Sequence, residues 1–125
     1  MTYRFAFERL EVYQKAKALV RLVYGLTAAF PQKERYGLGA QLSRAVVSVA
    51  SNIAEGSSRT SGKDQAHFSQ MAYGSLMEVL CQLDVACELD YLSNDQLVRA
   101  RESIEEIARM PTALRKTQGR KGEKP

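Results

Sequence analysis

Residues 36–62 read YGLGAQLSRAVVSVASNIAEGSSRTSG, a stretch rich in small residues that ends in a polar run. Side chains that could face a core recur there every three or four positions, which is the spacing of one face of an α-helix packed along its length. They form two adjacent lines: Leu38, Leu42, Ala45, Val49 and Asn52, and Leu42, Val46, Val49 and Ile53. Alanine and serine fill the positions between these lines, so neighbouring backbones could approach closely. We therefore expect the central helix of a helical bundle.

Polar side chains stand at or beside this apolar face. A polar group buried without a hydrogen-bond partner is strongly unfavourable, so these groups should be bonded to one another or to a neighbouring helix. We expect one structural polar network that fixes the helix register: Gln41, Arg44, Asn52, Glu55 and Glu78. In it Glu78 is the expected partner of Arg44 or Asn52. The alternative interpretation is a catalytic pair of Asn52 and Glu55.

Three further segments show the same helical periodicity, at residues 8–30, at residues 64–90 and from residue 93 onward. Pro31 should end the first of them, and Pro111 should kink or end the last. Because the connections are short, consecutive helices should be antiparallel neighbours. The sequence thus predicts an all-α, antiparallel up-down-up-down four-helix bundle over residues 1–116, and a disordered basic tail over residues 117–125.

Small and polar residues mark the expected helix ends. Gly56 should close the second helix in a left-handed conformation. Ser61 with Asp64, and Ser93 with Gln96, have the spacing of residues that cap the start of a helix. Gly74 and Ser75 interrupt the third segment and favour a close crossing with the second helix.

The first helical segment has more apolar surface than one bundle contact needs. Five of its residues lie outside the main apolar line: Leu10, Tyr13, Val20, Leu22 and Tyr24. They fit either a wide core stripe or an interface between subunits. The residues alone leave both interpretations open.

Composition narrows the class of protein. A chain of 125 residues with 45% hydrophobic and 26% charged residues is typical of one soluble globular domain. No apolar run is long enough for a membrane span, and the first residues lack a signal-peptide hydrophobic region. Cys81 and Cys87 fall on different helix faces, so we expect them to be buried small hydrophobic residues in a reducing cytoplasm. His67 has no second metal ligand nearby, and we expect no metal, cofactor or small-molecule substrate.

Charge is divided along the chain. Residues 1–63 have ten basic against four acidic residues, residues 64–110 have three against nine, and the last fifteen have five against one. The two halves could neutralise each other within one bundle, or one copy could meet the next head to tail. Arg59 and Lys63 flank the expected start of the third helix, where a phosphate oxygen could bind. A solvated loop is the alternative.

Five segments, in order along the chain, resemble the ribosomal-RNA intervening-sequence proteins, a family of four-helix bundle proteins. They are FERLEVYQKA (7–16), LTAAFP (26–31), YGLGAQLSRA (36–45), SNIAEGSSR (51–59) and GSLMEV (74–79). The resemblance implies a homopentameric ring. It also implies kinship with the accessory variability protein of diversity-generating retroelements, which binds nucleic acid and a reverse transcriptase. Seven positions match the family's recurring motif: Tyr36, Gly37, Gln41, Arg44, Asn52, Glu55 and Gly56.

This chain departs from the family pattern at two positions. Tyr13 stands where tryptophan is common, and its ring keeps this position largely apolar. Ser43 stands where a second arginine often precedes Arg44, which removes one cation from each subunit.

We expect a non-enzymatic oligomeric scaffold that binds RNA or DNA phosphates through a basic surface. The candidate contacts are Arg44, Arg59, Lys63, Arg115, Lys116, Arg120 and Lys121. No aromatic residue interleaves with the tail cations, so the tail has no stacking platform for single strands. The alternative is a protein-interaction or assembly module with no nucleic-acid role. An enzyme is the third hypothesis, and it would require Asn52, Glu55 and Glu78 to surround an open cavity.

Overall fold

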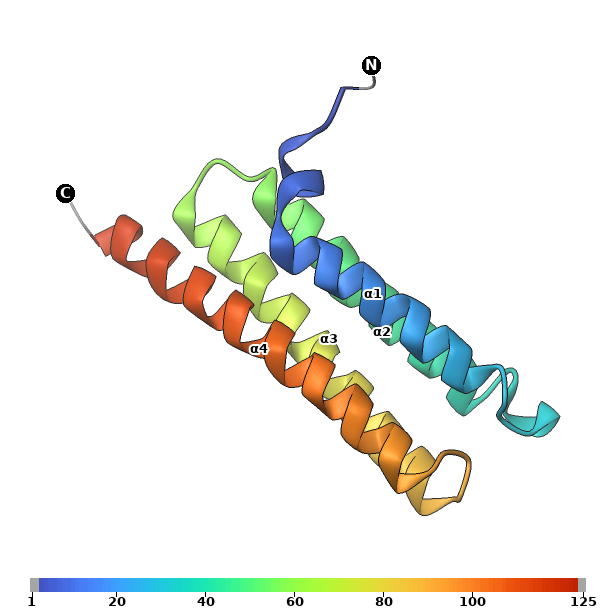
Figure 1. Ribbon diagram of the computed structural model, residues 1–125. Helices are drawn as coiled ribbons and strands as arrows, with labels where there is room; N and C mark the ends of the chain where they lie inside the picture. Colours follow the sequence, from blue (N-terminus) through green and yellow to red (C-terminus); the bar gives the residue numbers. More distant parts are fainter. Residues whose placement is uncertain (1–2, 124–125) are drawn as a thin grey trace.

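The computed structural model describes residues 3–123, with side chains described for residues 3–110. Its elements are η1 (Ala6–Arg9), α1 (Glu11–Thr27), η2 (Gln32–Glu34), α2 (Leu38–Ser57), α3 (Gly62–Glu88) and α4 (Asn94–Glu123), where η is a short 3-10 helix. No strand occurs in residues 3–123. The predicted all-α class is therefore confirmed, and the four long helices lie alongside one another as a bundle (Figure 1).

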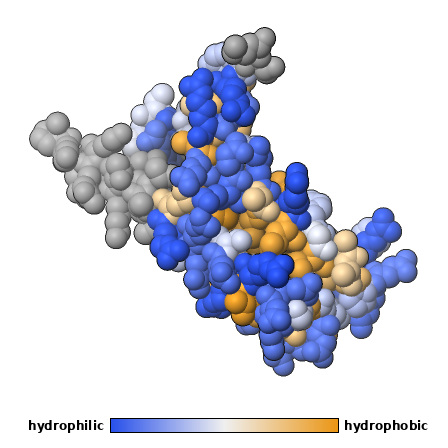
Figure 2. Space-filling model, in the orientation of Figure 1, coloured by the Kyte–Doolittle hydropathy of each residue, from blue (hydrophilic) through white to orange (hydrophobic). Residues whose placement is uncertain are grey.

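Each helix buries one apolar face in a single core. The largest fully buried side chains are Leu19, Leu42, Leu76, Leu83, Ile104 and Ile107. The two apolar lines predicted along α2 lie in this core, except that Leu38 and Asn52 are only half-buried at its edge. Contacts between α2 and α3 are the most extensive, and α1 and α4 are the least closely packed neighbours. Figure 2 shows hydrophobic surface between the α1 and α4 sides of the molecule.

The first helix is shorter than its periodicity predicted. Leu10 has an extended backbone with ψ 129°, so α1 begins at Glu11 rather than at Glu8. The residues before it form η1, in which the Glu8 carboxylate accepts a hydrogen bond from the Phe5 N–H at 2.9 Å. At the other end α1 stops at Thr27, three residues before the predicted Phe30. Its Lys15 reaches α4, where Nζ lies 2.6 Å from the Glu106 carboxylate.

The surplus apolar residues of α1 are divided between core and surface. Leu10, Tyr13, Val20 and Leu22 are half-buried and pack against the core, as a wide core stripe requires. Tyr24 is different, because 48% of its surface is exposed. One ring of the set therefore remains accessible on α1.

The prediction that Gly56 is a left-handed cap is wrong. Gly56 is buried within α2, and the helix continues to Ser57. No described glycine has a positive φ; the one described residue that does is Asp90, with φ 63°, in the turn after α3. The physical reason for glycine is close packing, since a Cβ at position 56 would lie 2.9 Å from the Cβ of Phe68 on α3.

Small residues along α3 have mixed roles. Ser75 does meet α2, where its hydroxyl lies 2.9 Å from the hydroxyl of Ser48. The prediction for Gly74 is wrong, because a Cβ there would meet nothing within 4 Å. The prediction that both cysteines are buried is also wrong, because Cys81 is exposed and Cys87 is half-buried. Both Gly74 and Cys81 lie on the outward face of α3, where apolar packing does not determine the residue type.

The predicted caps at the starts of α3 and α4 are confirmed. The Asp64 N–H donates to Ser61 Oγ at 3.1 Å at the start of α3. Before α4, the Gln96 N–H donates to Ser93 Oγ at 3.1 Å and the Ser93 N–H donates to Gln96 Oε1 at 2.8 Å. Helix α4 runs through Pro111, so it does not end there. Side chains from residue 111 onward lie outside the described part, and the disordered tail stays a prediction.

Candidate nucleic-acid interface

One edge of α1 carries two basic side chains between two tyrosines. Tyr13, Lys17, Arg21 and Tyr24 follow one another at spacings of four, four and three residues, which places them on one side of the helix. The Lys17 ammonium lies 5.2 Å from the centre of the Tyr13 ring. This edge faces α2, because Tyr13, Lys17 and Arg21 line a surface hollow together with α2 residues.

The facing side of α2 supplies small and polar residues. Ala50, Ala54 and the hydroxyl residues Ser43, Ser48 and Ser51 occupy it, with Val47 and Arg44 between them. Ser43 Oγ donates to the Gly39 carbonyl at 3.0 Å, so this hydroxyl keeps free acceptor capacity. Short side chains on one wall and long ones on the other leave a depression between the two helices.

Four hollows join to form this depression, which we call the α1–α2 groove. Neighbouring hollows share the following lining residues: Tyr24 and Ser43, then Val47 and Ser51, then Phe7 and Ala54. The groove therefore runs from η2, past the length of both helices, to the N-terminal segment around Phe5. Its floor is apolar, and its rim carries Lys17, Arg21, Arg35 and Arg44.

The cations of the rim are not neutralised by the protein. Within the described residues, neither Arg21 nor Arg44 makes a hydrogen bond or an ion pair. Arg35 stacks over the Tyr36 ring at 5.6 Å, and Lys17 over Tyr13, so both keep their positive charge without a carboxylate partner. Positive potential consequently remains at the surface along the groove.

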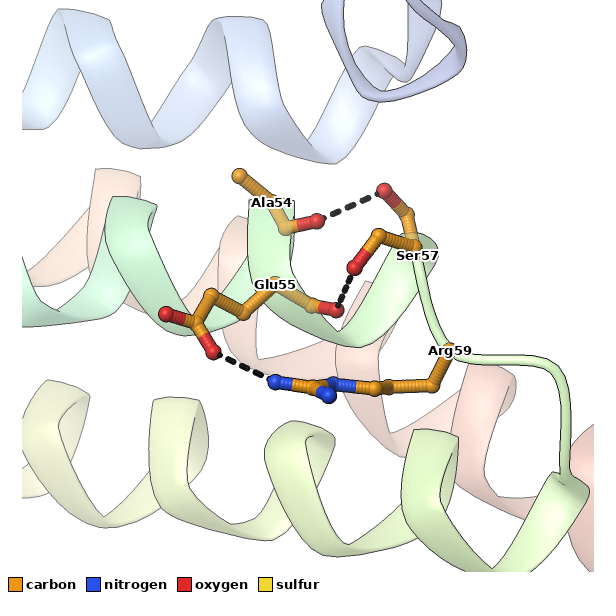
Figure 3. A network of polar contacts seen from close by, with 5 residues as sticks. Ala54, Glu55, Ser57 and Arg59 are labelled. Carbon is orange, nitrogen blue, oxygen red and sulfur yellow. Dashed lines mark hydrogen bonds and ion pairs between the residues drawn. The ribbon is translucent and has the colours of Figure 1, made fainter.

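Both carboxylates that line the groove are already bonded. Glu34 accepts from the Leu38 N–H at 3.2 Å and from the Tyr91 hydroxyl at 2.9 Å. The Leu38 N–H, and then Tyr91, hold the pKa of Glu34 below its ordinary value, and the bond to Glu34 raises the pKa of Tyr91. At the other end, Glu55 Oε2 lies 3.0 Å from the Arg59 guanidinium (Figure 3). Glu55 is thus neutralised by Arg59, whereas Glu34, which is held by neutral donors, remains an anion at the η2 end of the groove.

The residues predicted to form one polar network belong to three separate hydrogen-bonded groups. Asn52 donates to the Ser48 carbonyl and hydroxyl at 2.9 and 3.0 Å, and Glu55 pairs with Arg59. Gln82 of α3 donates to Gln41 at 3.2 Å and to Glu78 at 3.1 Å. Sequence spacing could not separate these groups, because it does not show which side of α2 faces each neighbour.

Two of the predicted pairings are wrong. Glu78 bonds Gln82, not Arg44 or Asn52, and Arg44 points to the groove instead of the network. Gln82 was missed by the sequence reasoning, although its amide joins α2 to α3. Its Oε1 is a buried atom with no hydrogen-bond partner among the described residues.

The predicted phosphate site at the start of α3 is weaker than its sequence suggested. Arg59 is bound by Glu55 and its guanidinium lies 4.7 Å from the Phe68 ring, so its donors are turned toward the protein. Lys63 is exposed. The Ser61 hydroxyl already accepts one of the first amides of the helix. One of the two predicted cations is therefore already paired, and the phosphate site stays a prediction.

The remaining candidates lie elsewhere. They are in the segment whose side chains are not described: Arg115, Lys116, Arg120 and Lys121.

Among the described residues, no three His, Cys, Asp or Glu side chains come together as a metal site. Over the same residues, no helix is both long and apolar enough to cross a membrane.

A family model described as 23S rRNA-intervening sequence protein matches residues 8–113. This chain belongs to that family. A solved structure of similar fold comes from Bacteroides thetaiotaomicron and is described as a protein of unknown function from the S23 ribosomal protein family. It is 18% identical, with a TM-score of 0.78, and the match covers 84% of this chain and 95% of that one. No curated protein matches the sequence.

This family member combines α1 and α2 residues that the sequence reasoning did not group. Lys17 and Arg21 were not considered, and Tyr24 was assigned only to the surplus apolar surface of the first helix. The available signal was the run of Tyr13, Lys17, Arg21 and Tyr24 on one helix edge. Whether these four residues line a groove depends on which helix packs beside α1.

Proposed function

We propose that this protein is a non-enzymatic scaffold of the cytoplasm that binds nucleic-acid phosphates through the rim of the α1–α2 groove. The bundle has antiparallel up-down-up-down topology, and copies of it associate, with the pentamer implied by family resemblance as the expected ring. Phosphate contacts of this kind hold RNA or DNA without reading sequence. A reverse transcriptase is the protein partner that the same resemblance implies.

The observation that carries the proposal is the unpaired state of Arg21 and Arg44. They come from two different helices and flank adjoining hollows of the groove. An arginine held in an intramolecular ion pair must lose that partner before it can bind phosphate, whereas these two need not. The fork of donors on each guanidinium also suits phosphate oxygens.

The non-enzymatic part of the proposal has its own support. Asn52, Glu55 and Glu78 were the arrangement that an enzyme would need, and each is hydrogen-bonded to a different residue. They do not converge on a common reacting atom. General acid-base chemistry requires such convergence.

A second candidate is the assembly module with no nucleic-acid role. It is favoured by the outward face of α3, where Met71, Val85 and Leu89 are 44%, 45% and 49% exposed. Glu78 and Glu88 lie on the same face and are exposed. An acidic and apolar face of this kind could dock on a basic and apolar surface of another copy.

The two candidates are separated by an RNA titration of the purified protein in low salt, followed by fluorescence anisotropy. We expect binding that weakens steeply with added salt, as counterion release requires. The double variant Arg21→Gln/Arg44→Gln should bind more weakly and should reduce the slope of log K against log[salt] by roughly 1 to 2.

The matched control is Arg99→Gln/Arg101→Gln, which removes the same charge from exposed positions on α4. It should retain most of the affinity. An unmodified protein that leaves RNA unbound in low salt, or equal losses in the two double variants, would contradict the proposed function. Light scattering on the same samples measures the assembly size.

A further inference from the structure

We propose that the ligand of the α1–α2 groove is single-stranded RNA, with a base stacked on the Tyr24 ring and phosphates held by Arg21 and Arg44. This inference rests on the proposed function, and it adds the form of the nucleic acid and its path. The path follows the groove between the two helices.

The shape of the groove favours a single strand. Its walls are two directly packed helices, whose axes are about 8–10 Å apart in such packing. Bases of a single strand are free to turn into the depression between them. A duplex keeps its bases paired and stacked, so it offers the rim phosphates, 2′-hydroxyls and base edges but no base faces. Apolar floor residues such as Ala50 and Ala54 would then meet base surfaces only when the strand is single.

Tyr24 stands where stacking requires an exposed ring. It is 48% exposed and lines two adjoining hollows, one of which it shares with Arg44. Tyr13 lies in the next hollow with Lys17 and Arg21, but its half-buried ring is already in contact with Phe7 and Lys17. An exposed ring beside unpaired cations in one groove is the combination by which proteins hold single strands without sequence preference.

The polar wall of the groove favours RNA over an apolar protein helix. Ser43, Ser48 and Ser51 present hydroxyl groups along α2. Ser43 and Ser48 are already hydrogen-bonded within the protein, but Ser51 has no partner among the described residues, so an apolar helix laid on this wall would remove its hydroxyl from water without offering one. Phosphate oxygens and the 2′-hydroxyl of ribose can both hydrogen-bond to such groups. The free cations of the rim add charge complementarity to the same ligand.

The test compares a short fluorescein-labelled oligouridine strand with a duplex RNA of the same strand length. Tyr24→Leu removes the ring from an exposed position and keeps an apolar side chain. It should weaken single-strand binding by about tenfold and leave duplex binding nearly unchanged. Val98→Ala is the control, since Val98 is 55% exposed on α4 and lines none of the hollows of the groove. It should leave both affinities unchanged.

The outcomes distinguish this inference from the function on which it rests. If Tyr24→Leu weakens both RNAs equally or neither, while Arg21→Gln/Arg44→Gln still weakens binding, the stacked single strand is refuted and phosphate binding stands. If the unmodified protein binds neither RNA, both proposals fail. In that case light scattering of Val47→Arg, whose parent side chain is 41% exposed in the groove, shows whether a second copy covers it. Far-ultraviolet circular dichroism confirms that each variant is folded.

Discussion

Replacing Gly56 with alanine should destabilise this protein, although the same change stabilises most helices. In a helix interior alanine is favoured over glycine by about 0.8–1 kcal/mol. At position 56 the added Cβ would lie 2.9 Å from the Phe68 Cβ, closer than such atoms approach in folded proteins. The Phe68 Cβ is fixed to the α3 backbone, so it cannot swing away as the end of a flexible side chain could. Relief therefore requires α2 and α3 to separate at their most extensive contact.

The size of the effect follows from a matched pair of variants. Gly74 lies in the interior of α3, and a Cβ there meets nothing within 4 Å. Gly74→Ala should thus show the helix preference alone and stabilise by about 0.8–1 kcal/mol. Overpacking of a closely packed contact costs about 1–3 kcal/mol, so Gly56→Ala should unfold with a free energy about 1–3 kcal/mol below that of Gly74→Ala.

Urea denaturation followed by circular dichroism measures both free energies of unfolding. All samples should be compared at one protein concentration, because association of copies would stabilise the folded state. Because Gly56 is next to last in α2, the gain from helix preference there is at most that at Gly74, and the rest of the difference between the variants is the packing term. If Gly56→Ala is as stable as Gly74→Ala, the contact between Gly56 and Phe68 does not determine the residue at this position, and the reasoning is wrong.

Three further predictions concern stability. Leu76→Ala, at a fully buried position in α3, should lower the free energy of unfolding by about 2–5 kcal/mol in urea denaturation, whereas alanine at the exposed Val98 should change it little. Ser61→Ala removes the acceptor of the Asp64 N–H and should cost about 0.5–2 kcal/mol; retention of full stability would show that water replaces the cap. The folded-state pKa of Glu34 lies below the unfolded value, so its stabilisation is present above pH 4.5 and is lost as pH falls through the folded pKa. Stability of Glu34→Gln should therefore depend less on pH in that range, and a profile identical to that of the unmodified protein would refute the role of its bonds.

The sequence was most informative where one helix is enough to make the argument. The spacing of Leu42, Val46 and Val49 predicted the buried face of α2, and the pairs at Ser61 and Ser93 predicted how α3 and α4 begin. Each of these signals is local. The apolar face of a helix and the capping of its first-turn amides both depend on residues within a few positions of one another.

Pairings between helices could not be predicted in the same way. Gln41 was expected in one network with Asn52, yet they point to different partners, and Gln82 was not considered. Gly56 was read as a cap because glycine after a helical run is the common local signal. Its actual role depends on Phe68, twelve residues further along the chain, and only the packing of α3 on α2 brings the two together.

By itself, the sequence determined the helical class, the buried face of the second helix, the helix starts and the division of charge along the chain. The tertiary structure alone decided which charges remain free, and it placed Tyr24 of α1 in one hollow with Arg44 of α2. The physical reason is the range of the interactions. Helix formation depends on neighbours in the chain, whereas a groove and its free cations exist only after two helices have packed side by side.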